Sequence, residues 1–246
     1  MRYLLLILCW LLVSPGVWAE ASRDWDGTDD VVYSAADKTQ NDANFSMLVW
    51  FNPDTEGEGA EGRIFTFQGT GGYAVLNFAV SGTNQPRSSI NLGTDRTITG
   101  STNDITLDVW QFYAIYFVTS TDDSFIYEMN GTTCAELAVQ STSPGTNNLT
   151  SSTINLGANA TTGTFAFDGS VGYFQWWNSR SINCRESLEA MFFPCSEPNG
   201  LVACIPIWGD TTEVDLSGNG NSLPNVSGTT LVSTGPPVSF GHQMPL

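Results

Sequence analysis

The sequence predicts an all-β fold made of many short antiparallel strands. Charged residues are only 13% of the chain, whereas Gly, Asn, Ser and Thr are abundant. Short apolar runs alternate with turn-rich stretches, which is typical of antiparallel sheets. Residues 45–51 (FSMLVWF) and 110–118 (WQFYAIYFV) are apolar at successive positions. Strands of this kind have both faces covered or partly covered, which favours a sandwich of two sheets.

Several further segments have strand character. Residues 124–129 (SFIYEM) run into Asn130-Gly131, a pair that tolerates positive φ and favours a tight turn. Residues 201–208 (LVACIPIW) also read as a strand, and Pro206 places it at a sheet edge or marks its end. The remaining strand candidates are residues 63–67, 73–80, 88–92 and 153–156.

One short helix is expected after residue 183. Asn183 and Glu186 have the spacing of a capping box, in which each side chain accepts from the other residue's backbone N–H. Pro194 ends the segment. We expect exposed loops at 56–62 and 142–152. The helix would bury an apolar stripe made of Leu188, Met191 and Phe192.

The first nineteen residues have the pattern of a secretory signal peptide. A basic start precedes the apolar run 4–13, and Val17-Trp18-Ala19 offers small residues at the two positions that signal peptidase reads, with cleavage expected after Ala19. The alternative is an apolar helix of the mature fold. The mature domain would span 20–234, followed by a C-terminal extension at 235–246. No later segment is long and apolar enough to predict a membrane span.

The charge balance argues against nucleic acid as a partner. Eight basic residues face 25 acidic ones, for a formal net charge of −17. Such a surface repels phosphate backbones. The acidity fits either a metal-loaded surface or one that is simply solvated.

Four cysteines remain after the signal segment: Cys134, Cys184, Cys195 and Cys204. An even number in a secreted chain predicts two disulfides, with three possible connectivities. Because Cys184 and Cys195 flank the expected helix, pairings among the last three cysteines are favoured. Zinc binding is not favoured, since the spacing matches no common finger and the sole histidine is His242.

Six segments follow one another in a distinctive order: WDGTDDVVY (25–33), NFSMLVWFNPD (44–54), RIFTFQG (63–69), VWQFYAIYFVTSTDDSFIYEMNG (109–131), STINLGAN (152–159) and FAFDGSVGYFQWWN (165–178). Their order and spacing over about 150 residues resemble laminin-G-like domains of the concanavalin A-like lectin/glucanase superfamily. The resemblance implies a two-sheet jelly-roll sandwich.

Residues 201–221 (LVACIPIWGDTTEVDLSGNGN) depart from the family order. In many relatives a similar strand and Asp-x-Ser-Gly-Asn-Gly-Asn motif precede the aromatic-Asp-Gly strand, whereas here they follow the helix. The resemblance therefore implies a permuted arrangement, in which 201–234 completes the same sandwich. The alternative is a separate appendage.

The resemblance also implies a calcium site at an edge of the sandwich. Asp26 stands at the start of the first strand, and Asp168 begins a later strand that lies beside it in the family fold. Carboxylates and carbonyl oxygens in loops suit calcium. The alternative is that both Asp-Gly pairs simply make turns.

Catalysis is not expected. With His242 near the C-terminus, a histidine-dependent triad is not favoured. Glucanases of the superfamily carry Glu-x-Asp-x-x-Glu on one strand, and the nearest string here, Glu213-Val214-Asp215, lacks the third carboxylate.

The adjacent Trp176 and Trp177 pose a choice between packing and recognition. Neighbouring strand residues point to opposite faces. In the family pattern Trp176 lies between the sheets, after a bulge near Gly172. Trp177 then faces the helix or a ligand, with packing favoured. Tyr73, near a Gly-rich loop, is a second ligand-binding candidate.

These features predict a secreted, non-catalytic recognition module for a glycan or cell-surface partner. The competing hypotheses are a structural protein of a virion, envelope or appendage, and a glycoside hydrolase. Calcium is the candidate cofactor, and the expected location is extracellular or on a particle surface. Glycosylation depends on the source. Its candidate sites are Asn44, Asn130, Asn148, Asn159 and Asn225.

Overall fold

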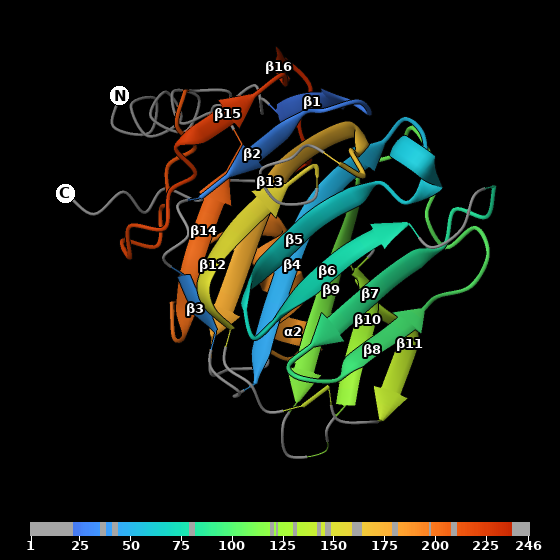
Figure 1. Ribbon diagram of the computed structural model, residues 1–246, viewed down its shortest axis with the longest axis vertical. Helices are drawn as coiled ribbons and strands as arrows, with labels where there is room; N and C mark the ends of the chain where they lie inside the picture. Colours follow the sequence, from blue (N-terminus) through green and yellow to red (C-terminus); the bar gives the residue numbers. More distant parts are fainter. Residues whose placement is uncertain are drawn as a thin grey trace, which may run out of the picture.

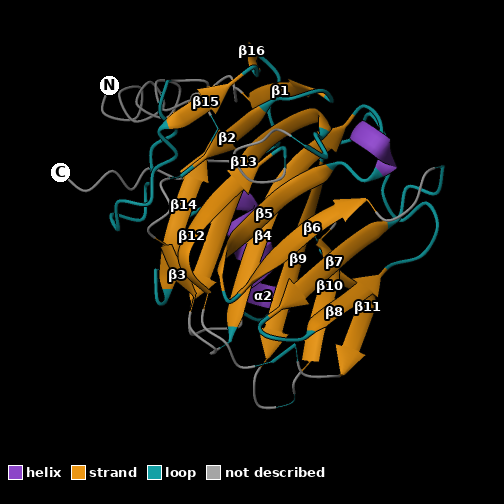
Figure 2. Ribbon diagram, viewed as in Figure 1, coloured by secondary structure: helices purple, strands orange, loops and turns teal. Residues whose placement is uncertain are grey.

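The protein folds as two antiparallel β-sheets packed face to face, and Figure 2 shows the described α-helix behind them (Figure 1, Figure 2). Apolar side chains from both sheets fill the space between them. The predicted jelly-roll sandwich is confirmed. The computed structural model describes residues 22–34, 38–40, 44–78, 82–118, 121, 123–129, 132–141, 144–145, 149–158, 164–178, 182–196, 198–207 and 211–237.

Sheet A has the strand order β11-β10-β9-β4-β13-β1-β16, with β14 also paired to β13. Its central strands β4 and β9 are buried on both faces, as their apolar runs predict. The bounds are Ser22–Asp26 (β1), Phe45–Pro53 (β4), Gln111–Val118 (β9), Asp123–Met129 (β10), Cys134–Ser141 (β11), Asp168–Asn178 (β13), Leu201–Pro206 (β14) and Thr230–Val232 (β16).

Sheet B has the order β15-β2-β12-β5-β6-β7-β8, with β3 also paired to β12. Strand β7 alternates buried and half-buried residues, since only one face of the sheet packs on the core. The bounds are Val31–Tyr33 (β2), Lys38–Gln40 (β3), Arg63–Thr70 (β5), Gly72–Phe78 (β6), Pro86–Asn91 (β7), Asp95–Thr99 (β8), Leu149–Leu156 (β12) and Asn225–Ser227 (β15), and a 3-10 turn, Glu58–Ala60, precedes β5.

The C-terminal segment is built into both sheets. Strand β13 pairs with β1 along its first half and with β14 along its second half, so these two strands share one edge of β13. Strand β15 pairs with β2, and β16 pairs with β1. Pro236, which we expected in the C-terminal extension, is buried beside Gly172, so the packed chain continues past residue 234.

Strand β13 separates its two tryptophans as predicted. The β13–β4 register shifts between Val171 and Tyr173, which places a bulge at Gly172. Trp176 then lies in the cluster between the sheets, 1% exposed, with its ring centroid 4.7 Å from that of Phe67.

Trp177 lies on the opposite face of sheet A, beneath the helix. Its side chain is fully buried in a second cluster with Trp50 and Met191. The indole of Trp50 donates to the Met191 carbonyl at 3.1 Å. This burial leaves Trp177 no surface to offer a ligand, so its candidate binding role is corrected to packing.

The helix α2 (Cys184–Phe192) forms where the capping box predicts it. The Asn183 side chain accepts from the Glu186 N–H at 3.0 Å, and the Glu186 carboxylate accepts from the Asn183 N–H at 2.8 Å. Ala190 and Met191 face the sheet. Among the described residues, no helix is long and apolar enough to cross a membrane.

Two disulfides attach the helical segment to sheet A. Cys195 pairs with Cys204 of β14, within the favoured group. Cys184 pairs with Cys134, which lies outside that group. The β10–β11 hairpin brings Cys134 to the helix, because it sets Cys134 opposite Met129, and Met129 packs in the cluster beneath α2.

Several predicted features lie outside the described residues, and one expected loop is partly a strand. The signal segment, His242, Asn130, Asn148 and Asn159 lie outside the described residues. The expected loop at 142–152 is partly strand, because β12 begins at Leu149, whose side chain packs in the core.

Candidate functional site

The outer face of sheet B carries a polar groove of about 320 Å³. Its floor is made by strands β5, β6, β7 and β8, whose alternate residues point away from the core. Strand register arranges these residues in cross-strand rows. The groove is lined by Arg63, Asn77 and Arg87 in one row, by Val75, Ser89 and Thr97 in the next, and by Gln68, Tyr73 and Asp95 in the third.

Tyr73 is the one predicted ligand-binding residue that lies in this groove. It lies on β6 with its side chain on the outer face, and it is half-buried. Burial, and then a hydrogen bond with the Asp95 carboxylate, raise the pKa of its hydroxyl above the ordinary value. The aromatic ring and hydroxyl are therefore fixed at the end of the groove marked by Asp95.

The other groove residues were missed by sequence reasoning. Arg63 and Arg87 are 24 positions apart, and both are register partners of Asn77 on the strand between them. The available signal was the polar alternation of the segment that becomes β7, where Arg87 is followed by Ser89. That alternation identifies an outward face but not its neighbours.

A second polar region lies at one end of the outer face of sheet A. Asp26 and Asp168 are direct register partners, so the two candidate metal ligands do lie side by side. Asp24 pairs with Ser170, whose hydroxyl donates to the Asp24 carboxylate at 3.2 Å. Asp54 joins them from the bend directly after β4, and its N–H donates to the Asp168 carbonyl at 3.0 Å. We call Asp24, Asp26, Asp54 and Asp168 the acidic rows.

Like charges and burial perturb this region. Burial, and then the charges of Asp168 and Asp26, raise the pKa of Asp24. Burial, followed by Asp24 and Asp168, likewise raises the pKa of Asp54. The folded state therefore holds carboxylates at an energetic cost at neutral pH.

Two observations bear on whether a cation fits in or beside the acidic rows. Carboxylate oxygens of Asp26, Asp29 and Asp30 lie within 4.8 Å of one another, although only Asp26 of this group belongs to the acidic rows. Asn52, the register partner of Ser170, has a buried side-chain oxygen with no hydrogen-bond partner. An all-oxygen donor set with an unsatisfied carbonyl suits calcium chemistry. The simpler turn role is also present, because Asp26 accepts from the Thr28 N–H at 3.0 Å.

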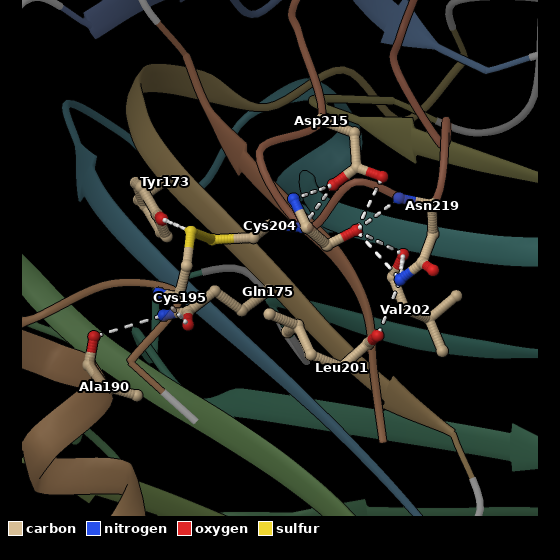
Figure 3. Close-up of a disulfide and its surroundings, with 10 residues drawn as sticks. Tyr173, Gln175, Ala190, Cys195, Leu201, Val202, Cys204, Asp215 and Asn219 are labelled. Carbon is tan, nitrogen blue, oxygen red and sulfur yellow. Dashed lines mark hydrogen bonds between the residues drawn. A yellow bond between two sulfur atoms is a disulfide. The ribbon is translucent and has the colours of Figure 1, made fainter. Parts of the chain in front are cut away.

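The Glu213–Asp215 string is structural. Glu213 is buried and forms an ion pair with Arg23 of β1. Asp215 accepts hydrogen bonds from the N–H groups of Cys204 and Asn221 at 2.9 and 2.8 Å. Figure 3 shows Asp215 beside Cys204, with Asn219 close to Leu201 and Val202. Glu213 thus holds the loop against β1 and Asp215 holds it against β14, so the two carboxylates are engaged in structural contacts.

A cavity of about 450 Å³ lies next to this ion pair, and it is lined by Arg23, Tyr33, Thr211, Pro224, Asn225, Val226 and Ser227. Asn225, one of the two glycosylation candidates in the described ranges, is half-buried there, and its amide donates to the Tyr33 carbonyl at 3.4 Å. Asn44, the other, is half-buried just before β4.

Comparison with solved structures shows the same fold in proteins of low sequence identity. The native heptameric SAP-like pentraxin of Limulus polyphemus has a TM-score of 0.55 at 11% identity, over 93% of this chain and 98% of that one. The CBM40 of Ruminococcus gnavus IT-sialidase, solved bound to α2,3-sialyllactose, has a TM-score of 0.50 at 10% identity, over 69% and 96%.

The tailspike protein 2 of Escherichia coli O157:H7 bacteriophage CAB120 has a TM-score of 0.51 at 13% identity, over 75% of this chain but only 26% of the tailspike. A search among curated proteins found no match in sequence. Residues 26–183 match the family model described as the concanavalin A-like lectin/glucanases superfamily. With well over half of its length matched, the chain belongs to the laminin-G-like branch of that superfamily.

Proposed function

We propose that this chain is a secreted, non-catalytic recognition module that binds a saccharide in the polar groove of sheet B. The observation that carries the proposal is the groove itself: hydroxyl, amide and guanidinium groups project in register from a rigid sheet, with Tyr73 at one end. Saccharides present many hydroxyl groups, which such a lining can satisfy by donating and accepting hydrogen bonds.

The small number of carboxylates in the groove of sheet B supports saccharide binding without hydrolysis. Glycoside hydrolysis uses two carboxylates about 5–10 Å apart, whereas Asp95 is the one carboxylate among the described residues that line the groove. Secretion is supported by the two disulfides, which persist in oxidising compartments. The fold relationship to a sialidase module solved with sialyllactose fits this proposal.

Replacement of Tyr73 by Ala is expected to weaken saccharide binding about tenfold, because the ring forms one end of the groove. A glycan array identifies a ligand, and calorimetry then measures its affinity. The matched control is Tyr127→Ala, since Tyr127 is also half-buried but lies on β10 of the other sheet. Equal loss in both variants, or cleavage of the bound saccharide, would contradict the proposal.

We further propose that the acidic rows bind calcium. The proposal rests on the paired Asp26 and Asp168, on the raised pKa values that burial and like charges cause at Asp24 and Asp54, and on the unsatisfied oxygen of Asn52. A divalent cation would offset the repulsion and accept the free oxygen as a ligand.

The expected result is a calcium-dependent stability that changes with pH. Carboxyls with a folded pKa above the unfolded one favour folding at acid pH and lose that contribution as pH rises through the folded value. Calcium should therefore raise Tm by about 5 °C at pH 7 and by much less at pH 4. Differential scanning calorimetry with and without chelator measures both shifts.

The calcium test has its own matched controls. Asp168→Asn should remove most of the shift at pH 7, whereas Asp123→Asn, which makes the same charge change on β10, should keep it. A Tm that does not respond to calcium in the unaltered protein would refute the metal site and leave the saccharide proposal standing.

A further inference from the structure

Two arginines form a cationic pair at one end of the groove on sheet B. Arg63 on β5 and Arg87 on β7 are both register partners of Asn77 on β6. Neighbouring strands are about 4.8 Å apart, so the two arginine backbones are separated by roughly 10 Å across one intervening strand. Both side chains line the same groove.

Each guanidinium is held in place by its surroundings. The Arg63 guanidinium carbon lies 4.8 Å from the centroid of the Phe165 ring. Arg87 donates through Nε to the Asn77 side-chain oxygen at 3.4 Å, and its Nη2 is 3.4 Å from the Glu61 carboxylate. The arginines are therefore positioned by a ring, an amide and one acid.

The two positive charges act on one another. Burial, and then the charge of Arg87, lower the pKa of Arg63 from its ordinary value, although an arginine stays protonated at neutral pH. This concentration of positive charge is unusual in a chain of net charge −17. Elsewhere in the described ranges, Arg23 and Lys38 are buried in the fold.

The other end of the groove has the opposite character. Asp95 lies there with Tyr73 and Gln68, and Val75 is the apolar residue between the two ends. A ligand that carries one anionic group near the arginines and neutral hydroxyls near Asp95 matches this polarity. A second anionic group at the Asp95 end would be repelled.

We infer that the groove selects a carboxylate-bearing saccharide, whose carboxylate lies between Arg63 and Arg87. The inference rests on the proposed saccharide-binding function. A planar carboxylate fits the fork of a guanidinium, and such charge-assisted hydrogen bonds are about twice as strong as neutral ones. The Arg87–Glu61 contact is partly exposed and hence weak, so an incoming carboxylate can replace it.

The test compares acidic saccharides with their neutral esters. The probes are α2,3-sialyllactose and galacturonate, each of which carries a single carboxylate and is paired with its carboxyl methyl ester, which keeps the sugar rings and removes the charge. At least one acid should bind about tenfold tighter than its ester. That difference should shrink between 50 and 500 mM NaCl, because salt screens the interaction.

Variants of Arg63 and Arg87 test whether these two arginines cause the preference for the acid over its ester. Arg63→Gln and Arg87→Gln should each reduce the acid-to-ester preference to near unity, and Arg63→Lys should keep part of it. The control Arg185→Gln makes the same charge change at an exposed position on α2 and should keep the full preference. Tm measurements verify folding, and Arg63→Lys provides the test if a glutamine variant does not fold.

The outcomes separate the two proposals. If an acid and its ester bind equally well, or if Arg185→Gln lowers the preference as much as Arg87→Gln does, the carboxylate inference is overturned and saccharide binding stands. If none of the four probes binds and a neutral glycan binds instead, the carboxylate inference is again overturned. If no saccharide on an array binds at all, the proposed function itself fails.

Discussion

Replacing Trp176 by Ala is expected to lower the free energy of unfolding by about 3–5 kcal/mol, a large packing loss for a single residue. Its indole is 1% exposed between the sheets and contacts the Phe67 ring from sheet B. Removing it leaves a cavity that neither sheet can close without breaking strand pairs. Urea unfolding at pH 7, with the disulfides intact, measures the change.

The control for Trp176→Ala is Phe193→Ala. Phe193 is also a large aromatic residue, but it is 49% exposed after α2. Replacing it by Ala should lower the free energy of unfolding by no more than about 0.5–1 kcal/mol. A cost below about 1 kcal/mol for Trp176→Ala, or equal costs for the two variants, would show that the space between the sheets is not packed as described.

Breaking the buried pair of Arg23 and Glu213 is the second large effect. Their side chains are 6% and 1% exposed, so either single change leaves the partner charge buried. Arg23→Met and Glu213→Leu should each cost about 3–5 kcal/mol. Arg23 also donates to the Thr229 hydroxyl at 3.1 Å, so its loss loosens the segment before β16 as well.

A double-mutant cycle tests the origin of that cost. In the double variant Arg23→Met/Glu213→Leu, no charge is left without its partner, so most of the stability should return. Denaturant unfolding of the unaltered protein, the two single variants and the double variant gives the coupling free energy between Arg23 and Glu213. Additive losses would mean that each residue acts through packing alone and that the ion pair contributes nothing of its own.

The parts of the fold that the sequence predicts are those decided by local pattern. The apolar run at 45–51 and the capping box at Asn183 each require nothing beyond their own neighbours, and both form as expected. Strand β8 (Asp95–Thr99) was missed because Ile98 is its one buried residue. Strand β11 was missed for a related reason, since it is an edge strand whose residues are at most half-buried.

The candidate site depends on register, which local pattern does not encode. Asp26 and Asp168 could be placed together only through the family resemblance, since 142 positions separate them. The alignment of Arg63 with Arg87 depends on the register shift after Arg63 in the β5–β6 pair. Trp177 could be assigned to packing from strand alternation, but its complete burial follows from where α2 lies.

The placement of β14, β15 and β16 has a consequence for biosynthesis. The N-terminal strands β1 and β2 are made first, yet each has a partner from the last part of the chain. During translation both sheets therefore keep open edges until residues 201–232 have left the ribosome. Open edges can pair with other chains, and such distant contacts form slowly. The nascent chain thus passes through a prolonged stage in which aggregation competes with folding.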